Sequence, residues 1–428
     1  MKLLLVGGGG REHALAWKLK RDDPSADVIA APGNPGIAEL GRCVPIAATD
    51  VDRLLACAQA EQVDLTVVGP EAPLAEGIVD RFREHRLPIF GPTARAAEIE
   101  TSKSFAKELM FRASVPTAAA TRHTDAAAAR EAARRIGAPV VIKATGLAAG
   151  KGVVVCGSMD AADAAIEMML LDNAFGSAGS EVLVEEFMSG EELSLFVLTD
   201  GEAVLPMLPA QDHKRLLEGD RGPNTGGMGS YAPVTIGAPA LVEQALERIV
   251  LPTLAALRSG GRTFTGLLYA GLMITDSGPK VVEFNCRFGD PETETLLPLL
   301  DSSLLEPVLA IAGGGGLGRV PQLHWLPRYS ATTVVAAHDY PESPRKGDRI
   351  VLPAGAPDVI VFHAGTARDA AGELVTAGGR VLAVTALGDT LAQAQERSTR
   401  HAGEIAFDGM HFRRDIGWRE LSRHARAT

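Results

Sequence analysis

The chain has 428 residues, of which 46% are hydrophobic and 22% charged, so it can bury large cores, and extended disorder is not expected. Its formal net charge of −11 repels nucleic acid and anionic membrane surfaces, and we expect neither as a partner. No apolar run approaches the ~20 residues of a membrane helix, the start is too short for a secretory leader, and the four cysteines lack metal or disulfide spacing, so we expect a cytoplasmic protein.

The first hundred residues alternate strand and helix patterns. Continuous apolar runs predict strands at 3–6, 28–31, 65–68 and 88–90, and helical spacing predicts helices at 12–20, 51–61 and 74–84. This order predicts a doubly wound parallel sheet, which binds ligands at the carboxyl ends of its strands. Those ends are the loops that begin at Gly7, Pro32 and Gly69.

The middle of the chain predicts a two-lobed α+β unit. Its first part, 102–190, predicts helices at 102–113, 125–136 (capped by Thr124 or Asp125) and 160–171, and strands at 139–143, 153–156 and 182–186. Its second part, 191–327, predicts strands at 193–199, 204–206, 267–274 and 280–284, and one long helix at 239–259. The segment 222–229 is too irregular for a helix or a strand.

The last part of the chain follows a glycine loop at 313–316. It predicts strands at 331–337, 359–364 and 380–386 and a helix at 390–402. We therefore expect an N-terminal α/β domain (1–101), two central lobes (102–190 and 191–327) and a C-terminal α+β domain (328–428).

The glycine run 7–10 lies between the first strand and the first helix. Its backbone N–H groups and the helix N-terminus suit an anion such as phosphate, although an ordinary tight turn explains the run about equally well. A dinucleotide fingerprint fails, because the third glycine position falls on Glu12 or His13 and the second strand ends in Pro32 without an acidic residue.

A second glycine loop, 145–153, joins two predicted strands. Only three residues separate Gly146 from Gly150, and Gly152 follows Lys151, so the loop is not a Walker motif. It predicts a hairpin whose amides can fold over phosphates, with a plain glycine hairpin as the alternative. Lys143 ends the preceding apolar strand, where a lysine needs an anionic partner to offset its desolvation.

Two oxygen-bearing side chains, Glu283 and Asn285, point to the same face of a predicted strand because they are two positions apart. Such a pair suits Mg²⁺, which takes its remaining ligands from water and nucleotide phosphates. The solvated face of an edge strand is the alternative. The adjoining loop, which carries Arg287 and Asp290, favours the metal site.

The motifs together resemble those of the phosphoribosylamine–glycine ligase (glycinamide ribonucleotide synthetase) family, in the ATP-grasp superfamily. The resemblance spans nearly the whole chain and includes GGREHA (9–14), VGPEAPL (68–74), GLAAGKG (146–152), QDHKR (211–215), PNTGGMG (223–229) and EFNCRFGDPE (283–292). It implies an ATP-grasp fold for the central lobes. The implied reaction joins glycine to 5-phosphoribosylamine through a glycyl phosphate and gives glycinamide ribonucleotide, ADP and phosphate in de novo purine synthesis.

The resemblance also implies a site, with ATP and Mg²⁺ (or Mn²⁺) as cofactors and a channelling partner in the purine pathway. Contacts to ATP are implied for Lys103, Lys143, Gly146, Gly150, Lys151, Gly152, Glu185, Glu186, Phe187 and Glu192, and metal ligation for Glu283 and Asn285. Contacts to the substrates are implied for Gly9, Gly10, Arg11, Glu71, Asp212, Arg287 and Asp290. Catalytic roles are implied for Lys143, Arg287 and Asp290.

The chain departs from the family pattern at a few positions. Gly8 stands where the family usually has Asn, and Thr145 where it usually has Asp. Many ATP-grasp enzymes have an acidic metal ligand twelve residues before the metal Glu, but that position is Gly271 here, so we expect only two protein ligands. The stretch 336–341 also departs from the usual Gly-Gly-Tyr-Pro pattern.

Three alternatives stay open at the level of sequence. The first is another ATP-grasp ligase or carboxylase with a different acceptor, and the second is a nucleotide-binding module without catalysis. The third is an NAD-linked oxidoreductase, which the failed dinucleotide fingerprint disfavours.

Overall fold

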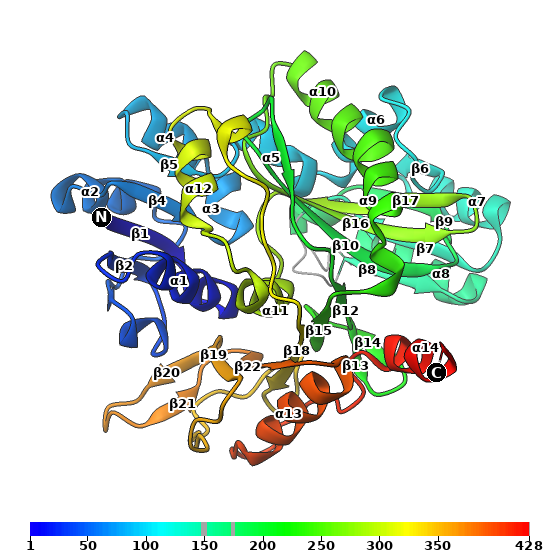
Figure 1. Cartoon of the computed structure of the whole chain (residues 1–428). Helices are drawn as coiled ribbons and strands as arrows, with labels where there is room; N and C mark the ends of the chain where they lie inside the picture. The colour runs from blue at the N-terminus through cyan, green and yellow to red at the C-terminus, as the bar shows by residue number, and fades with distance from the viewer. Residues whose placement is uncertain (147–151, 173–175, 428) are drawn as a thin grey trace.

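The N-terminal part of the molecule is a five-stranded parallel sheet, as predicted. The computed structural model describes residues 1–146, 152–172 and 176–427 (Figure 1). The sheet has the order β3-β2-β1-β4-β5 and consists of β1 (Lys2–Gly7), β2 (Asp27–Pro32), β3 (Arg42–Cys43), β4 (Leu65–Val68) and β5 (Ile89–Phe90). The strand order reverses beside β1, so its carboxyl end and that of β4 form the switch point at which such sheets bind ligands.

Both faces of this sheet are buried, which is why its strands are continuous apolar runs. Leu3 and Leu5 pack in one core cluster, whereas Leu4 and Val6 pack in another with Leu54 of α2 (Val51–Glu61). The first cluster also contains apolar residues of α1 (Gly10–Asp22). The alternation of side chains along β1 therefore holds a helix layer on each face of the sheet.

The predicted helix at 74–84 is wrong, because the structure has two shorter helices there. They are α3 (Glu71–Ala75) and α4 (Ile78–Glu84), and α5 (Ala94–Thr101) follows β5. Gly77 between them has a φ of +80°, a left-handed conformation that interrupts a right-handed helix. Because α3 begins at Glu71, that residue lies at the N-terminus of a helix, directly after the carboxyl end of β4.

The first central lobe is an antiparallel sheet with helices packed on it. Its order is β6-β9-β7-β8, from β6 (Ala120–His123), β7 (Val140–Ala144), β8 (Val153–Cys156) and β9 (Val182–Glu186). The helix α6 (Lys103–Arg112) leads into it. The helix α7 (Ala126–Ile136) is capped by Asp125, whose side chain accepts a hydrogen bond from the N–H of Ala128 at 2.8 Å. The helix α8 (Met159–Ile166) continues as a π-helical turn (Glu167–Leu171), and a 3-10 turn (Gly176–Gly179) precedes β9.

The second lobe is another antiparallel sheet, in the order β11-β10-β16-β17. Its strands are β10 (Glu191–Thr199), β11 (Val204–Pro206), β16 (Gly266–Thr275) and β17 (Gly278–Asn285). The predicted helix at 239–259 is confirmed in extent, as α9 (Pro239–Ala245), a π-helical turn (Leu246–Val250) and α10 (Leu251–Ser259). Pro252 lacks an N–H and displaces the carbonyl one turn earlier, which accounts for the π-helical turn before it. Among the helices of the described residues, none is both long and apolar enough to pass through a bilayer.

The C-terminal sheet has five strands and draws two of them from the middle of the chain. Its order is β12-β15-β18-β22-β19, from β12 (Gln211–Asp212), β15 (Gly229–Ala232), β18 (Tyr329–Ala336), β19 (Val359–His363) and β22 (Arg380–Gly388). Two hairpins, β13 (Arg215–Leu217) with β14 (Arg221–Asn224) and β20 (Thr366–Arg368) with β21 (Leu374–Thr376), extend from it, and the helices α13 (Leu391–Glu404) and α14 (Trp418–Ala427) follow. The prediction that 222–229 is irregular throughout is wrong, because 222–224 belong to β14, which pairs with β13, and Gly229 begins β15.

Two short helices link the second lobe to this sheet. The helix α11 (Glu292–Leu296) packs against α1, β15 and β18, and Figure 1 shows it where the N-terminal part and the C-terminal sheet meet. The helix α12 (Leu305–Ala312) packs against β5. The loop between β17 and α11, which carries the motif 283–292, thus lies where all parts of the chain converge.

Candidate active site

One cavity, of about 530 Å³, takes its lining from every part of the chain. The residues of the predicted site that line it are Arg11, Glu71, Lys103, Lys143, Gly152, Glu185, Glu186, Phe187, Glu192, Asp212, Glu283, Asn285, Arg287 and Asp290. Gly9 borders it, since a Cβ placed there would lie 3.6 Å from Asp290 Oδ2. Gly10 abuts Glu294 of α11, and Gly146 packs on Ala178. Gly150 and Lys151 lie outside the described residues.

Lys143 finds its anionic partner inside the protein. At the end of β7, its Nζ lies 2.8 Å from Glu185 Oε2 and donates to the carbonyl of Val282 at 3.2 Å. Lys107 of α6 approaches the same carboxylate, with Nζ 3.2 Å from Oε1. Burial lowers the pKa of Lys107 to about 8, against the opposing charge of Glu185. The Glu185 side chain therefore neutralises two buried lysines, and Lys107 is a residue that the sequence analysis missed, although it follows Lys103 by one helical turn.

Lys103 completes this cationic wall. Its Nζ donates to the carbonyl of Gly146 at 3.2 Å, and its backbone N–H donates to the carbonyl of Thr145 at 2.8 Å. Burial lowers the pKa of Lys103, although the charge of Glu283 opposes the shift. The beginning of the glycine loop is thus tied to α6, with an ammonium group directed along the cavity.

Glu283 and Asn285 lie on the same face of β17, opposite Gly271 and Tyr269 of β16. Burial would raise the pKa of Glu283, but the charges of Lys214 and the two cavity lysines outweigh it, and the pKa is lowered. Both side chains face the cavity, and Asn285 is only 8% exposed, so the alternative of a solvated edge strand does not hold. A carboxylate and an amide oxygen suit a hard divalent cation.

No third acidic ligand joins them. Gly271 offers no side chain, and within the described ranges no group of three His, Cys, Asp or Glu residues could hold a metal ion. Asn285 Oδ1 accepts a hydrogen bond from Arg287 Nη2 at 3.0 Å. The donor set fits a cation that is held jointly with nucleotide phosphates rather than by the protein alone.

Arg287 is fixed by two further acids on the side of the N-terminal domain. Its Nη2 lies 3.0 Å from Glu100 Oε1, and its Nε lies 3.4 Å from Glu71 Oε2. Burial opposes the charge, but the two carboxylates raise the pKa of Arg287 above its ordinary value. Cys286 donates its backbone N–H to Glu100 at 2.7 Å, so the strand end and α5 are held together.

Asp290 is paired with a residue of the C-terminal sheet, Arg380, that the sequence analysis missed. Nη1 of Arg380 lies 3.0 Å from Asp290 Oδ1 and also donates to the carbonyls of Asp290 at 2.7 Å and Gly226 at 2.6 Å. Burial would raise the pKa of Asp290, but Arg380 and Arg11 lower it. One guanidinium group thereby joins the motif loops 223–229 and 283–292 to β22.

A second group of acidic residues, Asp212 with Glu192 and Glu292, lines the same cavity. Burial raises the pKa of Asp212 to about 7, with Lys214 opposing the shift and Glu292 adding to it. Lys214 Nζ donates to Glu192 Oε2 at 2.6 Å, and Tyr269 donates its hydroxyl to Glu292 Oε1 at 2.7 Å. Glu192, the carboxylate predicted to bind the ribose, thus pairs with Lys214. The sequence analysis named Lys214 only as part of the motif 211–215.

The departure at Gly8 has a steric basis. A Cβ at this position would collide with the carbonyl oxygen of Gly33, in the loop after β2. Asn34 of that loop donates its side-chain N–H to the carbonyl of Gly8 at 3.0 Å. An asparagine at position 8 would therefore require the two loops to separate.

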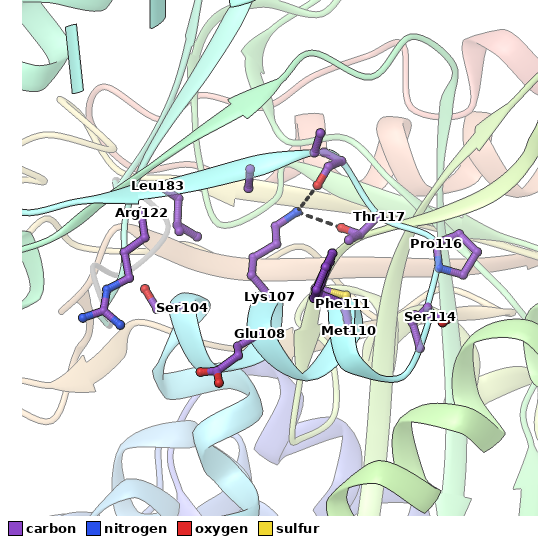
Figure 2. Close-up of a pocket in the computed structure, with 14 residues that line it drawn as sticks. Ser104, Lys107, Glu108, Met110, Phe111, Ser114, Pro116, Thr117, Arg122 and Leu183 are labelled. Atoms are coloured by element: carbon purple, nitrogen blue, oxygen red, sulfur yellow. Dashed lines mark hydrogen bonds between the residues drawn. The ribbon is translucent and has the colours of Figure 1, made fainter. Parts of the chain in front are cut away.

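A second hollow, of about 680 Å³, lies on the other side of Lys107 (Figure 2). The same Nζ donates there to Thr117 Oγ1 at 2.8 Å and to the carbonyl of Ala118 at 3.1 Å. Of the predicted site residues that the structure describes, none lines this hollow. Lys107 and its partners separate it from the cavity that holds the motifs.

The fold and the cavity define an ATP-grasp enzyme, and known domains match the chain in order. They are described as phosphoribosylglycinamide synthetase, with its N domain at 1–100, its ATP-grasp (A) domain at 101–293 and its C domain at 330–419. A biotin carboxylase structure from Campylobacter jejuni covers 96% of this chain and 92% of its own at a TM-score of 0.72, but at 16% identity it shares the fold alone.

Full-length relatives carry the identification further. Phosphoribosylamine–glycine ligase of Neisseria meningitidis serogroup B is 50% identical over 426 residues, which cover 99% of this chain and 100% of the relative. The enzyme of Pseudomonas aeruginosa is 49% identical over 429 residues, 99% of each chain. The crystal structure of the Thermotoga maritima enzyme has a TM-score of 0.85 and 32% identity, and the match covers 97% of this chain and 100% of that one. The chain belongs to the phosphoribosylamine–glycine ligase family and is an ATP-dependent ligase of purine biosynthesis.

Proposed function

We propose that the 530 Å³ cavity is the place where this ligase binds ATP, a divalent cation, glycine and 5-phosphoribosylamine together. The observation that carries the proposal is the composition of its wall. Lysines from the first lobe, oxygen ligands from the second lobe and Arg11 from the N-terminal domain face one another there. A site that must hold three substrates at once needs such a junction of domains.

ATP is proposed to lie between the two lobes. Lys103 and Lys143 contact its phosphates, and the 146–152 loop, with Gly146, Gly150, Lys151 and Gly152, covers them. Backbone groups of Glu185, Glu186 and Phe187 meet the adenine, and Glu192 takes the ribose hydroxyls. This assignment is supported by the position of these three residues at the carboxyl end of β9, where all of them line the cavity. Lys214 would share Glu192 with the ribose.

Mg²⁺ (or Mn²⁺) is proposed to bind Glu283 and Asn285. When bound, it offsets charge on the terminal phosphates of ATP and so favours transfer of the γ-phosphoryl group. The hydrogen bond from Arg287 to Asn285 is then in competition with the cation. Since only two protein ligands are available, binding of metal without nucleotide is expected to be weak.

The two remaining substrates are assigned to the other half of the cavity. The phosphate of phosphoribosylamine is proposed to lie on the backbone of Gly9, Gly10 and Arg11, at the N-terminus of α1. Glu71, Arg287 and Asp290 contact the sugar and glycine. Asp212, next to Glu292, provides negative charge for an ammonium group, which suits glycine.

The proposed chemistry proceeds in two steps. A carboxylate oxygen of glycine attacks the γ-phosphorus of ATP, and the bond to the bridging oxygen breaks to give glycyl phosphate and ADP. The amine of phosphoribosylamine then attacks the glycyl carbon, releases phosphate and loses a proton. Lys143 is placed to stabilise negative charge on the transferred phosphoryl group, and Arg287 and Asp290 to orient the reacting amine and carboxyl groups. Closure of the site protects the acyl phosphate from water.

Two further expectations concern the cell rather than the site. A cytoplasmic location and a channelling partner that receives the product are proposals from the sequence. Cell fractionation tests the first. An isotope-dilution experiment tests the channelling partner. When the ligase and the partner enzyme are both present, added unlabelled glycinamide ribonucleotide should dilute the labelled product less than it would if that product diffused freely between the two enzymes.

A coupled ADP assay across carboxylates and amines tests the substrate assignment. ADP release is expected only when glycine and phosphoribosylamine are both present. Release with bicarbonate and none with glycine would contradict the assignment and favour a carboxylase. Binding of ATP without turnover for any pair would favour a binding module.

Glu283→Gln tests the metal assignment. The amide keeps the shape of the side chain but removes the charge, so we expect kcat to fall on the order of 10²-fold or more, and a higher Mg²⁺ requirement. Glu202→Gln, an exposed change in the turn between β10 and β11, is the control. Wild-type activity of Glu283→Gln at limiting Mg²⁺ would refute the assignment.

A further inference from the structure

Glu294 is a buried acid that has no role in the site described above. It lies on α11 with 1% of its surface exposed. One of its carboxyl oxygens is so close to Gly10 that a Cβ at that position would collide with it. The carboxyl group is therefore packed directly against the backbone of the glycine loop, from the side of α11.

The surroundings of Glu294 offer it no donor. Neither carboxyl oxygen has a hydrogen-bond donor among the described residues. The charged group that acts on it most strongly is the carboxyl group of Asp290, another acceptor, and the charge of Arg380 opposes this effect only in part. Two carboxyl groups can form a hydrogen bond with each other only if one of them carries a proton.

The charges around this pair decide which acid holds the proton. Asp290 is the ionised member, because Arg380 of β22 pairs with it at 3.0 Å. The titratable groups on the packed elements are Arg11, Glu12 and His13 in the first turn of α1, Arg380 on β22, Tyr231 on β15 and Tyr329 on β18. Further along α1 lie Lys20, Arg21 and the pair of Lys18 with Asp22. Arg11 pairs with Glu12, the buried His13 is neutral because burial lowers its pKa to about 3, and Tyr231 donates to Gln211.

Among the described residues, Glu294 thus has no cation of its own, because Arg380, whose charge reaches it, is paired with Asp290. Burial, followed by the charge of Asp290, raises the pKa of Glu294 well above its ordinary value. An ionised carboxylate in this position would be an unpaired buried charge, which is among the costlier arrangements in a protein.

We propose that Glu294 is a positioning residue that works as a neutral carboxylic acid: it donates its proton in a hydrogen bond to Asp290 and keeps the glycine loop free of negative charge. The proposal deepens the assignment of the substrate phosphate to Gly9, Gly10 and Arg11 and rests on it. An anion that binds on one side of this loop would be repelled by a carboxylate on the other side. The neutral acid removes that repulsion. Its hydrogen bond also fixes Oδ2 of Asp290, since Arg380 is paired with Oδ1.

Infrared difference spectroscopy tests the protonation state without any substrate. The spectrum of wild-type protein minus Glu294→Gln at neutral pH is expected to contain the C=O stretching band of a neutral carboxylic acid. The exposed Glu306→Gln on α12 is the matched control, and its difference spectrum should contain carboxylate bands only. Absence of the acid band for Glu294 overturns the proposal, whatever the substrate assignment.

Steady-state kinetics test the positioning role. Glu294→Leu should raise KM for phosphoribosylamine about tenfold, the effect of one pKa unit of interaction, with little change in KM for ATP. Glu294→Gln, which can still donate to Asp290, should restore it. In the wild type, KM for phosphoribosylamine should rise at alkaline pH as Glu294 ionises, and this rise should vanish in Glu294→Gln.

Three kinetic results would overturn the role. They are equal KM for the Leu and Gln variants, the same alkaline rise in Glu294→Gln as in the wild type, and a change in kcat alone. If Glu294→Leu does not fold, the comparison of Glu294→Gln with the wild type still decides. An acid band together with unchanged KM in every variant would keep the neutral acid and overturn its role at the glycine loop. The infrared result does not depend on where the substrate phosphate binds, so failure of the neutral acid and failure of the substrate assignment are distinguishable.

Discussion

Glu185→Gln should destabilise the first lobe in a way that depends on pH. The carboxylate of Glu185 is 1% exposed and neutralises both Lys143 and Lys107, at 2.8 and 3.2 Å. The amide preserves the shape but leaves two ammonium groups without an anion. Breaking a buried pair in this way costs roughly 3–5 kcal/mol, and we expect about 3 kcal/mol at pH 6.

The pH dependence follows from Lys107. Its pKa in the folded protein is about 8, below the ordinary value of 10.5, so the unfolded chain binds more protons between these values and the free energy of unfolding increases with pH there. Without Glu185 the pKa of Lys107 falls further, and the increase begins at lower pH. The difference between variant and wild type should therefore be largest near pH 6 and smaller by about 1 kcal/mol or more at pH 9, where Lys107 is largely neutral in both.

Urea unfolding at pH 6 and pH 9, followed by circular dichroism, measures this difference. The control is Glu186→Gln, since the Glu186 side chain is half-buried, 41% exposed, and its Oε1 lies 3.7 Å from Lys280 Nζ; the change should alter stability by less than about 1 kcal/mol. A loss in Glu185→Gln below 1 kcal/mol, or an equal loss at both pH values, would refute the account of the shared carboxylate.

Three further variants test other parts of the site. In Lys214→Met, the pKa of Asp212 should rise above its value of about 7, so the acid limb of kcat/KM for glycine should move to higher pH; an unmoved limb would contradict the charge assignment. Gly271→Asp adds a carboxylate beside Glu283, and calorimetry should find that the variant binds Mn²⁺ about tenfold more tightly than the wild type in the absence of nucleotide. Equal affinity of the two proteins would argue against a metal site at Glu283 and Asn285. His13→Gln should unfold at lower pH than the wild type, because the lowered pKa of His13 makes the wild type lose stability as pH falls below 6.5; an unchanged acid midpoint would contradict this.

Local pattern was enough to predict the parallel sheet and the strand that carries Glu283 and Asn285. The period of two along a strand places Glu283 and Asn285 on one face, and this holds whatever the strand packs against. The continuous apolar runs of the N-terminal sheet likewise follow from burial of both faces. Such features need only the sequence and the geometry of one element.

Contacts between distant segments could not be predicted in this way. Arg380 reaches Asp290 only because β22 lies in a sheet beside the motif loops, and neither the sheet order nor its position is encoded in the local pattern. Glu294 looks like an ordinary first-turn acid of a helix until α1 is placed against it. Gly77 and the β14 strand were misread because glycine and proline mark turns, helix breaks and hairpin strands alike.

The composition of the C-terminal sheet has a consequence for how the chain can be divided. β12 and β15 precede most of the second lobe in the sequence, yet β15 pairs with β18, which begins at Tyr329. During synthesis, β15 therefore leaves the ribosome long before its partner exists and has an unpaired edge in the meantime. A fragment that begins at 328 would lack an edge of its sheet, and an exchange of C-terminal parts between relatives would have to include 211–232 to keep the strand pairs matched. The ligase is thus less modular than its linear order of domains suggests.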